Sequence, residues 1–344
     1  MGVKTISVSS NDSTYFVIPG STGSFSWDMA DASDTIYGQS FSSNQTTLGT
    51  WSCDSNAYWK GYAGYVANFL KSGTSTAATG EAMSLVSGLT YKITDATKNV
   101  WDYNNTITVY DGVTDVTAQV ESIDHLFGRI TFLGIYTVVG SITVDVNYFP
   151  MTSVGSAREF TLTMNAETKD VTSYAVAQAN GGYMEYEPGL RTVSIDASGF
   201  FSTSNTFQTI LDSRAEIVIE INPDGNDLST ARGFFKTSGT GRDGDVGATS
   251  NQNVNFVLSV PADSTVVTPF KWLHESSTTL SSAVQEILNA WQNETTIYVK
   301  SLEDGTNGDK GESVITDCSL SNSVDGINEF SVSFTGTGAT TSLP

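Results

Sequence analysis

Two stretches of the chain share one pattern of apolar and polar positions. Leu190–Asp196 reads Leu-Arg-Thr-Val-Ser-Ile-Asp, and Leu48–Asp54 reads Leu-Gly-Thr-Trp-Ser-Cys-Asp. Leu, Thr, Ser and Asp recur at the same spacing, and the two residues between Thr and Asp that would face inward are apolar in both copies. Aromatic residues follow at matching positions: Tyr58, Trp59 and Tyr65 after the first copy, and Phe200, Phe201 and Phe207 after the second. We interpret the two stretches as one supersecondary unit used twice.

The repeat extends to an alternating strand before each copy. Phe25–Met29 alternates apolar with polar residues, and Phe160–Met164 is its counterpart. After the aromatic residues, Tyr65–Leu70 and Phe207–Leu211 are each compatible with a short helical turn or a kinked strand. The pattern therefore predicts two related β units in one chain.

The first half of the chain reads as a series of short strands separated by turns. The spacing of 8–12 residues is typical of β-sandwiches and barrels. The expected strands are 89–94, 107–110, 119–123, 129–133 and 142–148. Pro150 closes the series, which places a domain boundary near residues 150–156.

The second half contains more strands and one clear helix. Apolar residues at 280, 284, 287, 288 and 291 fall on one face of a helix over 280–291, and Ser277, Thr278 or Thr279 supplies its cap. We expect a long polar loop over 237–253. The last stretch, Phe330–Gly338, alternates apolar residues with small hydroxyl residues, so one face of this strand is buried.

These elements predict an all-β fold with one main helix, arranged as tandem β-sandwich or β-barrel domains. The composition agrees, because only 15% of residues are charged and Gly (31), Ser and Thr are abundant. The expected organisation is an amino-terminal arm over 1–20, a first β domain over 21–152 and a second over 153–344. A chain of 344 residues is long enough for two such cores.

Charge restricts the partners of the chain. It has 37 acidic and 16 basic residues and a formal net charge of −21. Nucleic-acid affinity depends on Lys and Arg, so this surface repels DNA and suits a protein past which DNA moves without sticking. No run reaches 18 apolar residues and the amino terminus lacks the apolar core of a signal peptide, so we expect a soluble protein made in a cytosol, with no membrane contact.

The chain offers little catalytic chemistry. His125 and His274 have no nearby ligand partners, so we interpret His125 as a turn residue and His274 as a loop residue near the sheet. The sequence over 222–227 resembles a calcium loop only superficially and reads as a tight turn, and the glycine-rich 239–247 lacks a phosphate-loop lysine. Cys53 and Cys318 read as free, buried thiols. We therefore expect no enzyme, no metal and no cofactor.

The carboxy-terminal part resembles a known family. The resemblance is carried by the strand at Pro188–Ser194, the aromatic pair at 200–201, the single helix, the Gly-Glu-Ser-Val at 311–314 and the ending Phe330–Gly338. Together they resemble the major tail proteins, or tail tube proteins, of long non-contractile-tailed bacteriophages, over roughly residues 156–340.

The resemblance implies a structural virion protein that self-assembles into stacked rings, with a lumen that holds the tape measure protein and then viral DNA. The protein would be made in the host cytoplasm and reside in the virion tail. If residues 20–150 are a second copy of the tube unit, three chains per ring imitate six-fold symmetry. The alternative is six chains per ring, with residues 80–150 an outward immunoglobulin-like domain. We favour the trimer and expect a net negative lumen.

Two other classes fit parts of the pattern. A tail-tip or capsid decoration protein would share the acidic all-β composition without forming tubes. A carbohydrate-binding or adhesin module would use Trp51, Trp59 and Trp101 as a sugar platform, although aromatic residues in strands are more often core.

Overall fold

The computed structural model describes residues 5–33, 44–58, 66–72, 74–156, 159–200, 206–222, 229–243, 251–261, 267–274, 281–323 and 329–344. This part of the chain is all-β with few helices: 23 strands form two sheets, with α1 (Tyr174–Ala179), α2 (Thr206–Ser213) and α3 (Ser282–Asn293). The predicted fold class is confirmed, and α3 is the main helix.

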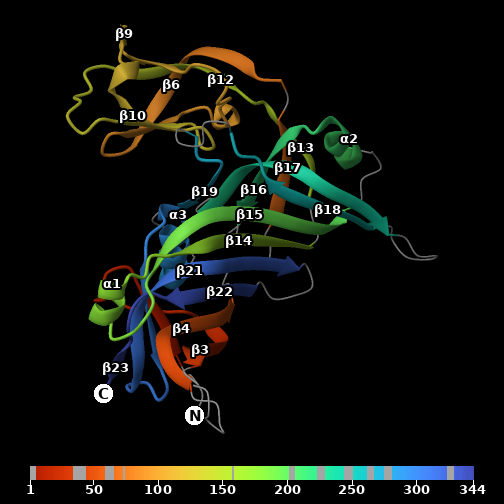
Figure 1. The fold of residues 1–344 in the computed structure, drawn as a ribbon. Helices are drawn as coiled ribbons and strands as arrows, with labels where there is room; N and C mark the ends of the chain where they lie inside the picture. Colours follow the sequence, from red (N-terminus) through yellow and green to blue (C-terminus); the bar gives the residue numbers. More distant parts are fainter. Residues whose placement is uncertain are drawn as a thin grey trace.

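Sixteen strands from both halves of the chain make up the large sheet. They are β1 (Thr5–Ser9), β2 (Phe16–Val17), β3 (Gly20–Ser33), β4 (Asn44–Tyr58), β5 (Val66–Ser72), β13 (Met151–Ser156), β14 (Glu159–Asp170), β15 (Tyr186–Phe200), β16 (Glu216–Asn222), β17 (Ser229–Asp243), β18 (Asn251–Leu258), β19 (Phe270–His274), β20 (Ile297–Leu302), β21 (Gly308–Ser323), β22 (Glu329–Gly336) and β23 (Thr341–Leu343). Strands β15, β14, β21, β22, β4 and β3 lie one below another (Figure 1).

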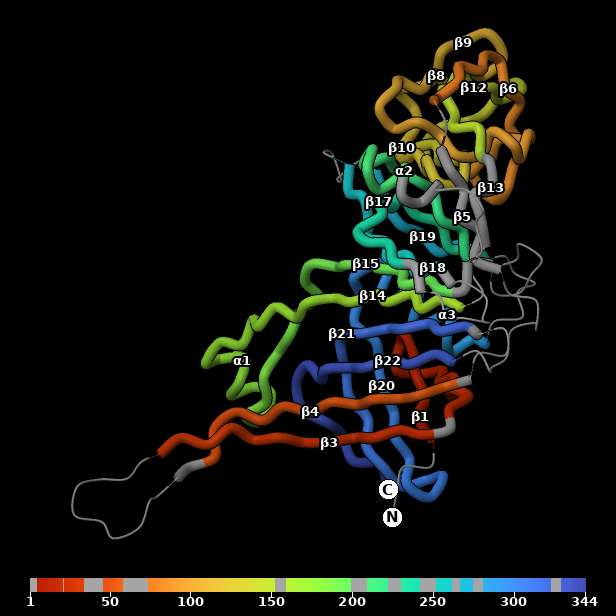
Figure 2. Tube along the Cα trace, turned by 90° about the vertical axis from the view of Figure 1, so that its right-hand side faces the viewer, coloured from red at the N-terminus to blue at the C-terminus, as the bar shows by residue number. Residues whose placement is uncertain are grey.

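The large sheet curves around its own core. In Figure 2, β20 and β1 run steeply behind β22 and β4, and α3 lies on the same side. Side chains alternate along the strands, so that Leu162 and Met164 of β14 are fully buried, as is Val299 of β20. They join one apolar core with α3, whose Ile287 and Leu288 are fully buried. Hydrophobic burial on this inner face leaves the other face of the strands to polar residues.

A smaller, seven-stranded sheet forms an inserted domain between β5 and β13. Its strands are β6 (Thr76–Ser87), β7 (Thr90–Ile93), β8 (Thr108–Asp111), β9 (Thr114–Asp115), β10 (Val120–Asp124), β11 (Arg129–Phe132) and β12 (Ile142–Tyr148). The five strands expected in this region are all present. The domain has its own apolar core, in which Trp101 is fully buried.

The inserted domain packs against one end of the large sheet. Leu126 and Phe127 share an apolar cluster with Val218 and Phe234 of β16 and β17. Two polar contacts flank this cluster: Tyr103 donates a hydrogen bond to Glu216 (3.0 Å), and Lys271 pairs with Asp124 (2.7 Å). The described structure thus attaches the insertion through both apolar and charged contacts.

Residues 5–20 of the expected amino-terminal arm contain strands β1 and β2, and β1 joins the large sheet by pairing with β20. Two expectations about organisation are wrong. The sheets do not divide near residues 150–156, because β3, β4 and β5 pair with strands of the carboxy-terminal half. The expected loop over 237–253 is largely a hairpin, in which β17 pairs with β18 up to Asp243 and Asn251. Its many Gly, Ser and Asp residues hid the strands from a composition argument.

The expected helical segments differ in detail. α2 covers the stretch near Phe207, whereas the supposed counterpart near Tyr65 is strand β5, so these two segments are not equivalent. α3 begins at Ser282 and ends at Asn293, and Ser281 is its cap, with its hydroxyl accepting from the Val284 N–H at 3.3 Å. The residues proposed as caps at 277–279 lie outside the described residues, as do Trp59, Tyr65 and Phe201.

Candidate functional site: a duplicated unit and its polar face

The large sheet consists of two units with the same strand order. The continuous unit comprises β5, β13–β15, α2 and β16–β19, and the split unit comprises β1–β4, α3 and β20–β23. Within the continuous unit the pairing runs β13-β5-β16-β17-β18-β15-β14, with β19 on β17. Within the split unit it runs β2-β1-β20-β21-β22-β4-β3, with β23 on β21. Each strand therefore has a counterpart, and every one of these pairings is antiparallel.

The β17–β18 and β21–β22 hairpins match residue by residue. A register shift falls between Thr237 and Gly239 in the first hairpin, and between Ile315 and Asp317 in the second. Aligning the two shifts also aligns Phe256, the partner of Thr237, with Phe334, the partner of Ile315. Shared bulges at shared positions indicate a common architecture, since bulges are retained features of a fold.

The β3–β4 and β14–β15 hairpins match as the sequence repeat predicted, but in a different register. Cys53 pairs with Phe25, whereas its sequence counterpart Ile195 pairs with Leu162. The structure thus matches Phe25 to Leu162, two residues beyond the match read from the sequence. A shift of two keeps every side chain on its original face. The second copy is therefore not residues 20–150: it joins both ends of the chain.

Trp51 lies in the core of the large sheet. It is 2% exposed, and its indole N–H donates to the Gly338 carbonyl at 3.0 Å. A Cβ added to Gly336 would come within 2.0 Å of the Trp51 ring, and one added to Gly311 within 2.4 Å. The continuous unit has Val193 in place of Trp51. Two glycines therefore provide the volume that the larger side chain fills.

The outward side chains of the central strands form one polar face. Cross-strand pairs connect them into rows. One row is Asn255, Asp196, Thr161, Ser321 and Glu329; a second is Ser194, Thr163, Ser319, Ser331, Asn56 and Thr22; a third is Thr192, Asn165, Asp317, Ser333, Asp54 and Ser24. No Lys or Arg occurs among these residues, and the second row continues on β18 and β17 as Val257 and then Lys236. The face crosses both units without interruption.

Hydroxyl groups bond to one another across this polar face. The Oγ atoms of Ser319 and Ser331 lie 2.6 Å apart, and Ser24 donates to the Asp54 carboxylate at 3.3 Å. Asp54 and Asp196 occupy equivalent positions in the two units, and both are exposed. Burial raises the pKa of Asp317 above its ordinary value. The face is thus a hydroxyl surface that carries carboxylates from both units.

Open grooves lie on the polar face near the strand ends. A groove of about 870 Å³ is lined by residues that include Glu159, Asp196 and Glu329. A smaller groove of about 250 Å³ beside it is lined by Thr22, Asn56 and Ser331, among others. Both grooves are open and lined mainly by polar residues, so they fit a contact or solvent-facing surface better than an enclosed small-molecule site.

The β3–β4 hairpin extends beyond the rest of the large sheet as a long ribbon (Figure 2). Its outer strand β3 pairs with β4 on one edge, and no strand pairs with its other edge in the described part of the chain. Trp27 and Met29 on β3 are 48% and 53% exposed. Exposed apolar residues on an unpaired strand edge are a typical surface for β-sheet addition.

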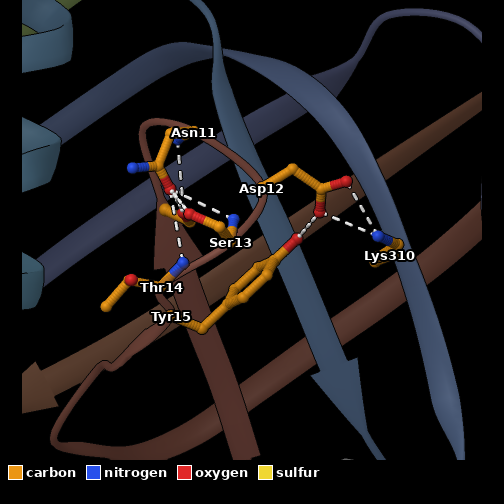
Figure 3. Close-up of polar contacts among 7 residues, drawn as sticks. Asn11, Asp12, Ser13, Thr14, Tyr15 and Lys310 are labelled. Atoms are coloured by element: carbon orange, nitrogen blue, oxygen red, sulfur yellow. Dashed lines mark hydrogen bonds and ion pairs between the residues drawn. The ribbon is translucent and has the colours of Figure 1, made fainter.

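The turn between β1 and β2 is fixed to β21 by a polar cluster (Figure 3). Asn11 Oδ1 accepts from the backbone N–H of Ser13 at 3.1 Å, which closes the turn. Asp12 accepts a hydrogen bond from Tyr15 and pairs with Lys310, whose Nζ lies 2.8 Å from both carboxylate oxygens. The Lys310 hydrogen bond holds the pKa of Asp12 below its ordinary value.

The two units use this same position differently. Lys310 lies opposite Lys300 in the β20–β21 pair, where the matching pair of the continuous unit is Arg232 opposite Glu220. Lys300 Nζ lies 4.2 Å from the centre of the Tyr15 ring, so the β1–β2 turn offsets the like charges of the split unit. Arg232 instead pairs with Glu220 (2.6 Å) and donates to the Leu126 carbonyl (3.0 Å) of the inserted domain.

The remaining residues singled out in the sequence do not come together. His125 lies buried in a turn of the inserted domain as expected, and burial lowers its pKa. His274 ends strand β19 rather than lying in a loop. Trp51 and Trp101 are buried in separate cores, so they form no sugar platform. The supposed calcium turn at 223–227 lies outside the described residues.

Cys53 and Cys318 are free and buried, as the sequence predicted. Burial raises the pKa of Cys53 to about 12, so its thiol stays protonated. Within the described ranges, no three His, Cys, Asp or Glu side chains are grouped so as to hold a metal ion. No described helix is long and apolar enough to span a membrane.

Comparison with known proteins gives limited similarity. No protein-family model and no curated protein matches the chain. Among solved structures, the fold is similar to a chain in the tail of an empty gene transfer agent particle with C6 symmetry (22% identity, TM-score 0.28, 32% of this chain and 82% of that chain). It is also similar to a chain in the virion of a native gene transfer agent particle (22% identity, TM-score 0.28, 32% of this chain and 84% of that chain).

Proposed function

We propose that this protein is a structural virion protein, a tail tube subunit that assembles into stacked rings around a channel for DNA. The observation that carries the proposal is the duplicated unit, whose two copies share one continuous sheet through the β14–β21 pairing. A chain that already joins two copies of one unit edge to edge needs only further copies to close a ring. Three chains would then supply six units.

The polar face supports a role as the channel wall. Its hydroxyl rows offer DNA neutral hydrogen-bonding groups that water satisfies equally well, and its carboxylates repel phosphates. In the proposed tube, this face lines the lumen and lets the tape measure protein and DNA pass. The inserted domain packs at the far end of the sheet, which suits an outer position.

Electron microscopy of the purified protein tests this proposal. We expect rings or tubes with a central channel as the concentration rises. A protein that stays monomeric at high concentration would contradict the tube. A tail-tip or capsid decoration role predicts oligomers of fixed size that never stack, so the same images separate the alternatives.

A further inference from the structure

Within the chain, one strand edge of the continuous unit pairs with one strand edge of the split unit. The two edges that could form a second junction of the same kind are both unpaired in the described structure. Inside the chain, β14 of the continuous unit pairs with Asp317–Ser323 of β21 in the split unit. The counterpart of β14 is β3, and the counterpart of β21 is β17. Both counterparts have an open edge in the described structure: β3 ends the branch that runs through β22 and β4, and β17 is paired by β16 only as far as Lys236.

The open edge of β17 is the counterpart of the β21 edge that pairs with β14. On β21, β20 reaches Ser313 and β14 takes over from Asp317. On β17, β16 reaches Lys236, one residue beyond the equivalent of Ser313, and among the described residues nothing pairs with the same edge of Gly239–Asp243. The continuous unit therefore lacks a strand at the position where β14 pairs with β21 in the split unit.

The open edge of β3 carries apolar side chains that its counterpart buries. Trp27 and Met29 are 48% and 53% exposed, whereas the matching Met164 and Ala166 of β14 are 0% and 7% exposed. The β17 side shows the same contrast, because Thr240 is half-buried where the matching Cys318 is fully buried. Both edges thus lack a cover that the internal junction provides.

We infer that β3 of one copy adds to the Gly239–Asp243 edge of β17 in a second copy, in the register of the internal β14–β21 pair. The inference rests on the proposed function and specifies its ring contact. We replace each residue of the β14–β21 pairs with its counterpart on β3 or β17. This places Trp27 opposite Thr240, Ser26 opposite Gly241 and Asp28 opposite Gly239. The occupant is another copy of this chain, because the chain itself carries both halves of the contact.

The contact continues the polar face from one chain to the next. Ser26 and Asp28 belong to the same face as Ser52 and Asp54, with the Ser26 and Ser52 Oγ atoms 2.8 Å apart. The contact is head-to-tail, so it closes when its rotation returns to the start. The internal junction relates two units by the same pairing, so a ring of three chains would contain six alternating junctions.

Cysteine cross-linking tests the register. Facing residues in antiparallel strands have Cα atoms about 4.5–5.5 Å apart, within disulfide range. We expect S26C/G241C to form disulfide-linked dimers and trimers on mild oxidation, with trimer as the largest species. The off-register control S24C/G239C should not cross-link. The native thiols give no background, because Cys53 and Cys318 are 0% exposed.

Mixing the single variants S26C and G241C should give dimers only, which shows that the link joins different chains. If S24C/G239C cross-links as efficiently as S26C/G241C, the proposed register is wrong. Rings seen by electron microscopy without S26C/G241C linkage would overturn this contact and leave the proposed function standing. Absence of any oligomer by light scattering would overturn both.

Discussion

Trp51 fills a space that two glycines leave open, and this packing is testable at one position. We predict that Gly336→Ala destabilises the fold by about 1–3 kcal/mol, the usual cost of overpacking a core. The reason is that the new methyl group would lie 2.0 Å from the Trp51 ring. Urea unfolding measures the loss. Gly134→Ala is the matched control, because a Cβ there meets nothing within 4 Å. Equal stabilities would contradict the packing.

Asp317 gives the polar face a measurable pH dependence. Burial raises its pKa in the folded state above the unfolded value near 3.8, so the folded state holds the proton more tightly. Ionisation therefore costs stability: the cost is absent below the unfolded pKa and fully present above the folded pKa. We predict that Asp317→Asn unfolds at a higher temperature than the natural protein at neutral pH, and that the gap closes as the pH falls below the unfolded pKa. If the difference in unfolding temperature widened in acid, the pKa of Asp317 would be lowered in the folded state, which would contradict the prediction.

Among the elements, the ribbon of β3 and β4 carries the exposed apolar residues of the sheet edge. We predict that Trp27→Asp prevents assembly without unfolding the chain, since Trp27 is 48% exposed and a charge in a strand interface is costly. Sedimentation velocity would show monomers, and circular dichroism would show an unchanged sheet. Val113→Asp is the control, because Val113 is 97% exposed on the inserted domain. If the Trp27→Asp variant still assembled, the β3 edge would not form the contact between chains.

Part of the fold could be predicted from the sequence because some strands keep both spacing and residue type. The Leu-x-Thr strands, the strands of the inserted domain and the α3 face follow from alternation and helical periodicity. The polar face was also partly foreseeable, since Phe330–Gly336 alternates with hydroxyl residues.

The split unit could not be predicted, because its halves lie at the two ends of the chain. The matching hairpins β17–β18 and β21–β22 retain few identities, such as Val254 with Val332 and Phe256 with Phe334. Alternation of this kind occurs in any half-buried strand, so it does not reveal a repeat. A better signal was Gln208-x-Ile-Leu and Gln285-x-Ile-Leu in the two matching helices. Strand edges depend on pairing, which composition does not encode.

For the whole molecule, the sign of the charge on the proposed channel wall is the property that matters for DNA. We predict that Asp54→Lys combined with Asp196→Lys turns the assembled protein into a DNA binder at low salt, because the two equivalent positions place lysines on the polar face of both units. Gel shift with short duplex DNA measures binding. The control Glu121→Lys with Glu303→Lys changes the net charge equally away from that face. Equal binding by both variants would contradict a DNA-facing role for the polar face.

The number of chains in one ring decides whether the two units alternate around it. A chain with two equivalent units joined through one sheet closes six-fold geometry with three copies, so native mass spectrometry of an isolated ring should give three times the chain mass of 36.7 kDa. Averaged images of the same ring should show six similar wall units and three inserted domains. A ring with six times the chain mass would contradict the account, because the two units would then not alternate around one closed sheet of six.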